Sequence, residues 1–311
     1  MEPQTEIKTV AGEETLDVKG KLLQFAFFMQ KEGLALSTTE KFSCTMKRLA
    51  KIADISDPES VKAALSRLKI EESTKSTYCA VYKSFLKFAG KTWSPPKYEC
   101  RQKLPEFLPT EEEIDQLIAG SGKKVGTLLR LMKETGMRLG ECLSLTWICV
   151  DFQKDVVTLT TAEKHSLPRI FKVSHTLISM LENLPKQNEK VFGTMSISSS
   201  GVGLRQARKR VAHKLANPRI TKIHYHLIRH WFGTMEYHKK PDIDYVRRLL
   251  GHKSVLNTQI YVNMEQAIFT SKSDEYLVKT AATVEEVCKL LEVGFEYVTE
   301  VEGVKLFRKR K

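Results

Sequence analysis

Two arginines, two histidines and one late tyrosine in this chain have the types and order needed to cleave a phosphodiester covalently. Arg138 follows a Thr-Gly pair, His226 and Arg229 lie one helical turn apart, and His252 precedes Tyr261 by nine residues (261 − 252 = 9). Guanidinium groups present planar donors that match two phosphate oxygens, and they keep their charge near neutral pH. Tyr261 is therefore the candidate nucleophile, and the arginines are candidates for stabilising a pentacovalent phosphorane.

A tyrosine nucleophile must lose a proton despite a pKa of about 10, so it requires a base and a cationic environment. His226 is our candidate base, since imidazole titrates closest to neutral pH. His252 is predicted to hydrogen-bond a non-bridging phosphate oxygen. The leaving 5′-oxygen requires a general acid, and we predict that Lys164 supplies it from a polar connection between two β-like runs.

Each of these residues taken alone has an ordinary structural interpretation. An isolated arginine is typical of a protein surface, and a lone tyrosine is typical of a core. His224, His226 and His230 also raise the possibility of a metal site, but no carboxylate or cysteine at suitable spacing completes it. The ordered set as a whole favours phosphodiester chemistry without a metal or another cofactor.

Charge and composition favour a polyanionic partner. The 311-residue chain carries a formal charge of 50 − 37 = +13 and has a pI near 9.3. A protein this basic favours nucleic acid first and an anionic membrane surface second. No apolar run approaches the roughly 18 residues that span a bilayer, and we expect no signal peptide. The six cysteines are scattered without a C-x-x-C pair, which predicts a reduced, intracellular and cytoplasmic protein.

Apolar periodicity predicts a helical first domain. Helices are expected from Lys21, from Ser37 as an N-cap, from Asp57-Pro58 and from about Ser73 to Phe88. A proline-rich stretch then predicts an extended linker. The predicted organisation is a polar leader (1–19), a helical core-binding, DNA-binding domain (20–92), the linker (93–108), a catalytic domain (109–282) and a C-terminal tail (283–311).

The second domain is predicted to be helical around a small β-sheet, so the fold class is mostly α with a small β component (α+β). It opens with a capping box, Thr110 with Glu113. Helices are expected at 124–134, 139–145, 175–184, 203–215, 226–238 and 242–250, and β-like runs at 156–159 and 170–173. The tail reads as a short helix and a hairpin that ends in four basic residues, whose role as solvated tail or phosphate contact is left open.

Basic residues concentrate between positions 205 and 250, which predicts a surface for the phosphate backbone. This basic surface comprises Arg205, Arg208, Lys209, Arg210, Lys214, Arg219, Lys222, Arg229, Lys239, Lys240, Arg247 and Arg248. Lysines of the first domain could line an opposite jaw, although each one alone is better explained as a solvated helix face.

With these residues in view, the chain resembles the tyrosine recombinases, also called the phage integrase family. The family motif T-G-x-R-x-x-E matches Thr135 to Glu141, and H-x-L-R-H matches His226 to His230 with Ile228 in place of leucine. The L-G-H and T-Q-x-Y motifs match Leu250 to Tyr261. The hairpin lysine five residues before an arginine fits Lys164 and Arg169 (169 − 164 = 5), although the usual glycine-rich lead is replaced by Thr161-Ala162-Glu163.

The resemblance implies a helical core-binding domain and a catalytic domain that close around double-stranded DNA. Tyr261 would form a 3′-phosphotyrosyl link and free a 5′-hydroxyl, and strands would be exchanged through a Holliday junction. It further implies a homo-oligomer, a tetramer in synapsis on DNA, that requires neither metal nor nucleotide and does not act on a membrane. Glu141 would support the site without reacting.

Two other interpretations stay open at this point. A type IB topoisomerase shares this chemistry and relaxes DNA alone. A DNA-binding architectural factor would have lost catalysis, which the intact set of charged residues disfavours. The sequence does not specify the DNA site, nor whether the task is integration, excision or dimer resolution.

Overall fold

The computed structural model describes residues 6–100, 104–163, 166–269, 276–301 and 303–310. For residues 6–17, 276–278, 301 and 310 it describes the backbone only. The chain divides into two compact units, residues 1–103 and 104–311. We describe each unit by itself.

The described part of the first unit folds into helices. They are α1 (Glu6–Lys31), α2 (Leu36–Leu49), α3 (Pro58–Arg67) and α4 (Glu72–Phe88). The first helix begins at Glu6, inside the stretch expected to be a leader. The second helix begins after Ala35 instead of Ser37, so Ser37 lies within its first turn. Helix ends are the least constrained part of a helix, because the terminal turns lack a full set of backbone hydrogen bonds.

The core of this unit is apolar and rich in aromatic rings. Phe25 and Tyr82 are fully buried among the helices, and the N-cap of α3 is Asp57, which accepts two backbone hydrogen bonds ahead of Pro58. Trp93 packs edge-on against Tyr82 with ring centroids 4.9 Å apart. The beginning of the predicted linker is therefore packed onto the first unit.

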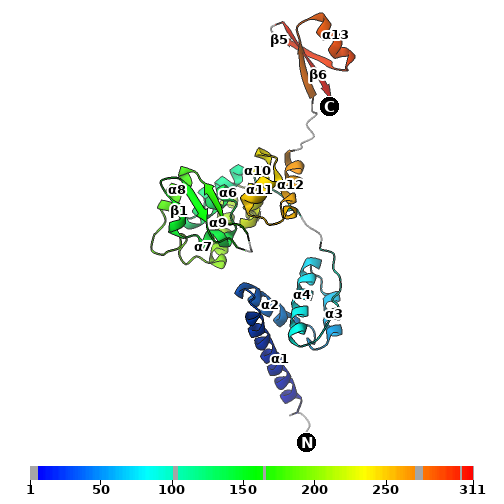
Figure 1. Ribbon diagram of the computed structural model, residues 1–311, viewed down its shortest axis with the longest axis vertical. Helices are drawn as coiled ribbons and strands as arrows, with labels where there is room; N and C mark the ends of the chain where they lie inside the picture. Colours follow the sequence, from blue (N-terminus) through cyan, green and yellow to red (C-terminus); the bar gives the residue numbers. More distant parts are fainter. Residues whose placement is uncertain (1–5, 101–103, 164–165, 270–275, 302, 311) are drawn as a thin grey trace. The chain divides into compact units, whose positions relative to one another are not determined.

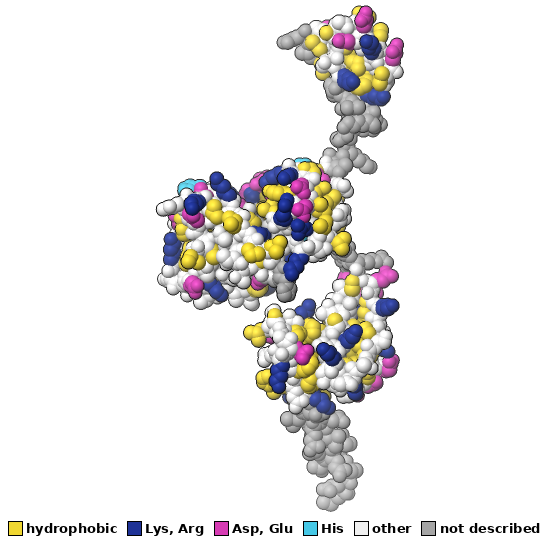
Figure 2. All heavy atoms as spheres, in the orientation of Figure 1, with side chains coloured by type: hydrophobic (Ala, Val, Ile, Leu, Met, Phe, Trp, Pro, Cys, Tyr) yellow, Lys and Arg dark blue, Asp and Glu magenta, His cyan; other side chains and the backbone are white. Residues whose placement is uncertain are grey.

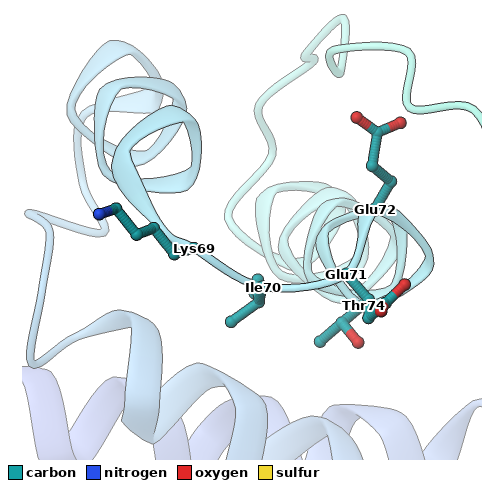
Figure 3. A pocket seen from close by; sticks show the side chains of 5 residues that line it. All are labelled: Lys69, Ile70, Glu71, Glu72 and Thr74. Atoms are coloured by element: carbon teal, nitrogen blue, oxygen red, sulfur yellow. The ribbon is translucent and has the colours of Figure 1, made fainter.

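A surface pocket lies at the connection between α3 and α4 (Figure 3). Its lining residues are Lys69, Ile70, Glu71, Glu72 and Thr74. In this view the Glu72 side chain points away from Ile70. Its carboxylate accepts a hydrogen bond from the backbone N–H of Glu99 at 3.0 Å. This contact also ties the segment after α4 to the first unit.

The second unit contains the predicted small sheet among helices (Figure 1). Its helical segments are α5 (Glu111–Ala119), α6 (Lys123–Thr135), α7 (Leu139–Ser144), η1 (Trp147–Cys149), α8 (His175–Glu182), α9 (Ile197–Lys214), η2 (Pro218–Lys222), α10 (Tyr225–Lys239), α11 (Ile243–Leu250), η3 (Val255–Asn257) and α12 (Gln259–Phe269). The antiparallel sheet runs β1 (Val150–Asp151), β2 (Val156–Leu159) and β3 (Arg169–Lys172) in that order.

Two apolar clusters hold the helices of this unit together. One joins α6, the sheet, α8 and α9, and it includes Leu131, Phe171, Ile178 and Leu204. The other joins α10, α11 and α12, and Trp231, Leu250 and Tyr261 belong to it. Figure 1 shows α10, α11 and α12 grouped beside α6, and α6 contacts both α8 and α10. The segments that carry the candidate residues are thereby placed next to one another.

A second small sheet follows near the end of the chain. It contains β4 (Tyr276–Ala281), β5 (Glu296–Val301) and β6 (Val304–Arg310) in the order β4-β6-β5, with α13 (Val284–Glu292) after β4. Ala281, Phe295 and Phe307 form its core. The helix and hairpin agree with the sequence prediction, whereas β4 was not predicted as a strand. Residues 308–310 lie in β6, and Lys311 lies outside the described residues.

The prediction of a mostly α fold with a small β component is confirmed. Among the described residues, no helix is long and apolar enough to cross a membrane. Figure 2 shows lysine and arginine side chains on the visible face of both units.

Candidate active site

Arg138 is fixed at the junction between α6 and α7. Gly136 ends α6 in the left-handed conformation, as its sequence context predicts, and Arg138 is the N-cap of α7. The Glu141 carboxylate accepts hydrogen bonds from the Arg138 backbone N–H at 2.9 Å and from its Nη1 at 3.0 Å. The Arg138 side chain is 23% exposed. The buried Glu141 therefore holds the Arg138 guanidinium on one side, and the guanidinium also reaches the surface.

Glu141 is completely buried and also binds a second guanidinium, that of Arg169. Arg169 Nη2 lies 2.7 Å from Glu141 Oε2, and Nη1 donates to the carbonyl of Leu250. Burial raises the pKa of the Glu141 carboxyl, but the Arg138 N–H and the charges of Arg169, Arg138 and Arg229 hold it below its usual value. Glu141 thus stays ionised and joins the two arginines.

Arg169 is a site residue that the sequence reasoning did not name as functional. In the sequence it served only to recognise Lys164, which precedes it by five residues. The alternation of buried and exposed residues in β3 places Arg169 on the inward side with Phe171. An arginine at an inward position of a strand requires a buried partner. That burial is visible only in the folded chain, and the sequence offered no signal that identifies Glu141 as the partner.

Arg229 lies in the middle of α10 and is 2% exposed. It donates to the carbonyl of Gly136 through Nη1 and to that of Leu250 through Nη2 at 2.9 Å. Nη2 also lies 3.0 Å from Nε2 of His252. Burial lowers the pKa of Arg229 to about 10, so the side chain remains a cation at neutral pH. Arg229 thereby connects the ends of α6 and α11 to His252.

His252 follows the left-handed Gly251, whose φ is 67°. A Cβ atom at Gly251 would lie 3.0 Å from the Arg169 guanidinium carbon, so the turn requires glycine for both conformation and space. His252 Nδ1 lies 3.0 Å from the hydroxyl of the buried Thr258. Burial and then the charge of Arg229 lower the pKa of His252 to about 3. His252 is therefore neutral near pH 7.

Tyr261 is 2% exposed and packs beside the same histidine. Its ring centroid lies 6.2 Å from that of His252 and 5.7 Å from that of His230. A Cβ atom at Gly233 would lie 2.7 Å from the Tyr261 ring, so α10 accepts this ring only at a glycine. Burial raises the pKa of the Tyr261 phenol, although the charges of Arg229 and Arg138 oppose the rise. In this conformation Tyr261 is protonated and withdrawn from solvent.

His226 and His230 lie one turn apart on α10, as predicted. His226 is exposed, and its ring meets that of His230 edge-on at 4.4 Å. Burial and the neighbouring His226 lower the pKa of His230 to about 4. His230 therefore stands between the candidate base and Tyr261, a position that sequence reasoning did not assign. In the part of the chain that the structure describes, no group of His, Cys, Asp or Glu is arranged to hold a metal ion.

The candidate general acid Lys164 lies outside the described residues. The structure brings together Arg138, Arg229, His252 and Tyr261, and His226 adjoins this group through the ring of His230. Arg138, Arg229 and His252 surround the end of α11, and the Tyr261 ring packs against His252. Three guanidiniums and one buried carboxylate leave an excess of positive charge beside a protonated phenol. Such a group of fixed cations is suited to binding a phosphodiester and stabilising the added charge of its transition state.

Several side chains of the basic surface bind groups of the protein itself, which the sequence did not predict. Arg208 donates to the carbonyl of Ile223 at 2.8 Å, and Arg210 donates to that of Gly120 at 2.6 Å. Arg219 forms an ion pair with Glu113 at 2.9 Å. Several others pair with acids on neighbouring turns, namely Lys239, Lys240, Arg247 and Arg248. Arg205 and Lys209 of α9 are exposed, one turn apart, and are better suited to contacting a polyanion.

Residues 109–267 match the phage integrase family. The chain is 23% identical over 202 residues to tyrosine recombinase XerA of Saccharolobus solfataricus, a match that covers 64% of this chain and 65% of that protein. It is 27% identical over 247 residues to tyrosine recombinase XerC of Natranaerobius thermophilus, covering 69% and 79%. The matched segment thus spans slightly less than two thirds of the length of XerA and more than two thirds of the length of XerC.

Solved structures show the same fold. The Tn1549 transposon integrase in complex with transposon right-end DNA superposes with a TM-score of 0.59 at 13% identity, covering 80% of this chain and 98% of that one. XerH recombinase bound to its difH substrate gives a TM-score of 0.53 at 18% identity, covering 80% and 84%. At these identities the likeness concerns the fold.

Proposed function

Because this chain belongs to the phage integrase family, we propose that it cuts and rejoins double-stranded DNA at specific sites through a covalent link to Tyr261. One observation carries the proposal. The arginines of two separate motifs, Arg138 and Arg229, share one site with the only tyrosine of the third motif. The names of the matched relatives, tyrosine recombinases, support the same activity.

The proposed reaction needs only groups of the chain and of the DNA. The Tyr261 oxygen attacks the scissile phosphorus and gives its proton to His226, while the bond from phosphorus to the 5′-oxygen breaks. Arg138, which reaches the surface, binds the non-bridging oxygens. Arg229 and His252 are buried, as Tyr261 is, and contact these oxygens only once Tyr261 has left its position beside them, and His252 then donates after its Nε2 gains a proton. Lys164, in our prediction, protonates the leaving oxygen. A 5′-hydroxyl from a partner strand then reverses the reaction and releases Tyr261.

The buried position of Tyr261 places one condition on this mechanism. A phenol that is 2% exposed does not reach a duplex, so Tyr261 must turn out of its pocket between His230 and His252 when DNA binds. The same movement relieves the burial that raises the pKa of the phenol, whereas the charges of Arg229 and Arg138 already oppose that rise in the buried position. Leaving the pocket therefore favours the phenolate, since burial opposes ionisation.

The test is capture of the covalent intermediate. The full chain is incubated with genomic DNA of its host and denatured, and the DNA that stays attached is sequenced to locate the site. A nicked duplex with that site then traps the adduct, because the short 3′-side strand diffuses away. We expect an adduct for the wild type and for Tyr245→Phe, a tyrosine of α11 outside the site, but none for Tyr261→Phe. An undiminished adduct in Tyr261→Phe would contradict the proposal.

Further measurements separate recombination from the related activities. Two copies of the recovered site on one plasmid should yield recombined circles, and the assembled complex should sediment as four chains on two duplexes. Relaxation of a plasmid that lacks the site would instead indicate topoisomerase activity. Specific binding of the site without cleavage would indicate an architectural factor.

A further inference from the structure

A single serine hydroxyl connects two of the motifs that form the site. Ser166 Oγ accepts a hydrogen bond from Arg138 Nη1 at 2.7 Å and donates one to the carbonyl of Gly251. These partners are 28 and 85 positions away in the sequence. A hydroxyl carries one donor and two acceptor lone pairs, so both bonds form at the same time. Neither partner belongs to the segment that carries Ser166.

The contact determines which edge of Arg138 is available for a phosphate. Nη1 carries two hydrogens, and the Glu141 carboxylate and Ser166 accept them at 3.0 and 2.7 Å. No other described residue accepts the hydrogens of Nε and Nη2, and together these two groups form the side of the guanidinium that binds two oxygens of one phosphate. Ser166 and Glu141 thus both bind Nη1 and leave available the Nε–Nη2 edge of a side chain that is 23% exposed.

The second hydrogen bond ties this arrangement to the turn of the third motif. Gly251 precedes His252, and its carbonyl is the acceptor of the Ser166 hydroxyl. The preceding carbonyl, that of Leu250, is bound by both Arg169 and Arg229. Ser166 therefore links Arg138 to the same short turn that the other two arginines hold.

We infer that Ser166 is a positioning residue for DNA cleavage, which acts by orienting Arg138 toward the scissile phosphate. The inference rests on the proposed function and adds a residue that the motifs do not contain. The hydroxyl does not touch the reacting atoms. It holds the guanidinium at the angle at which the Nε–Nη2 edge meets two phosphate oxygens, together with the turn that carries His252.

The experiment measures single-turnover cleavage of the nicked duplex by Ser166→Ala, Ser166→Thr and Ser144→Ala in the full chain. Ser144 is the control, because it is an exposed serine next to the site that donates to the backbone carbonyl of Glu141, at 3.0 Å, and not to another motif. We expect Ser166→Ala to cleave about ten- to a hundredfold more slowly, as for other small displacements of a binding group. Ser166→Thr keeps the hydroxyl and should recover most of the rate.

A second substrate identifies the arginine as the group through which Ser166 acts. A methylphosphonate at the scissile position lacks the negative charge that Arg138 neutralises, so loss of Arg138 should matter less on it. We expect the defects of Arg138→Ala and Ser166→Ala to shrink together on this substrate. Equal defects of Ser166→Ala on both substrates, or a normal rate on the phosphate, would overturn the inference.

Failure of the inference is distinguishable from failure of the proposed function. A wild-type chain that forms no adduct counts against the function, whereas a wild-type adduct with a normal Ser166→Ala rate counts against the inference alone. A crystal structure of Ser166→Ala gives a readout independent of activity. The Arg138 guanidinium should have moved from its position beside Glu141, and an unmoved guanidinium would also overturn the inference.

Discussion

Nη2 of Arg229 lies 3.0 Å from Nε2 of His252, and this contact assigns the tautomer of the histidine. A guanidinium only donates, so Nε2 must accept. The ring is neutral near pH 7, because its pKa is lowered to about 3 by burial and by Arg229. The proton therefore sits on Nδ1 and is donated to the Thr258 hydroxyl at 3.0 Å. To donate to a phosphate from Nε2, His252 must gain a proton or change tautomer when the phosphate engages Arg229.

Replacing Thr258 with valine should leave the Nδ1–H of His252 buried without an acceptor. We expect the unfolding free energy to fall by about 1–3 kcal/mol, the range for an unsatisfied buried donor, and cleavage to slow. Urea denaturation and the rate of adduct formation measure the two effects. Thr221→Val is the control, since Thr221 is exposed and donates only to the Pro218 carbonyl. Equal stability losses in both variants would contradict the assigned tautomer.

Gly233→Ala should displace the Tyr261 ring, because the new methyl group would lie 2.7 Å from it. We expect loss of stability by about 1–3 kcal/mol from overpacking and a changed rate of adduct formation. Gly201→Ala in α9 is the matched control, since a Cβ atom there has no neighbour within 4 Å. That variant should be more stable than the wild type by roughly 0.5–1 kcal/mol. A Gly233→Ala chain with normal stability would refute the tight contact.

Glu141→Gln keeps the shape of the side chain and removes the charge that Arg138 and Arg169 share. Arg169 is nearly buried, so its charge would lose its counterion, and we expect an unfolding free energy lower by about 3–5 kcal/mol. Adduct formation should also slow, because Arg138 loses its anchor. Glu113→Gln breaks the contact between the buried Glu113 and the half-exposed Arg219 instead and should cost stability but not the cleavage rate of the folded chain. If both variants lost the same amount of cleavage activity, the slower cleavage of Glu141→Gln would result from reduced stability and not from the loss of the Arg138 anchor.

Stability should fall as the solution is acidified from neutral pH toward about pH 5. The pKa values of His230 and His252, about 4 and about 3, lie below the unfolded value of about 6.5. Below about 6.5 the unfolded chain binds protons that the folded chain excludes, so this stability is present above that pH and decreases below it. Each histidine contributes at most about 1.4 kcal/mol per pH unit.

Urea denaturation at several values between pH 7 and 5 measures that slope. Replacing either His230 or His252 with glutamine should reduce the slope, and replacing the exposed His213 should not. A slope that is independent of these two histidines would contradict their neutral state in the folded chain.

DNA binding should depend on the exposed basic residues of α9. Because Arg205 and Lys209 are exposed, we expect each alanine variant to lower the slope of log affinity against log salt by about 0.9, the value for one phosphate contact. Fluorescence anisotropy over a range of salt concentrations measures the slope. Lys154→Ala, in the turn between β1 and β2 and outside the basic surface, should leave it unchanged. Unaltered slopes for Arg205→Ala and Lys209→Ala would place the DNA elsewhere.

The sequence by itself determined the elements around the candidate site and predicted the residues that carry its chemistry. Arginine, histidine and tyrosine at motif spacing singled out Arg138, His226, Arg229, His252 and Tyr261 as candidates, and apolar periodicity predicted α6, α10, α11 and the strands β2 and β3. Both signals are local. A helix or strand repeats its apolar face within a few residues, and a side chain's donor groups follow from its type alone. Lys164 stays a prediction, since it lies outside the described residues.

Only the tertiary structure decided how these groups bond to one another. The partners of Ser166 lie 28 and 85 positions away, and those of Arg229 lie 93, 21 and 23 positions away. Such contacts arise when α6, α10 and α11 pack around a shared core, and no local pattern records which buried polar atoms will meet there. Burial then fixes the neutral state of His252 and the protonated state of Tyr261, because the cost of a charge depends on the surroundings that packing creates.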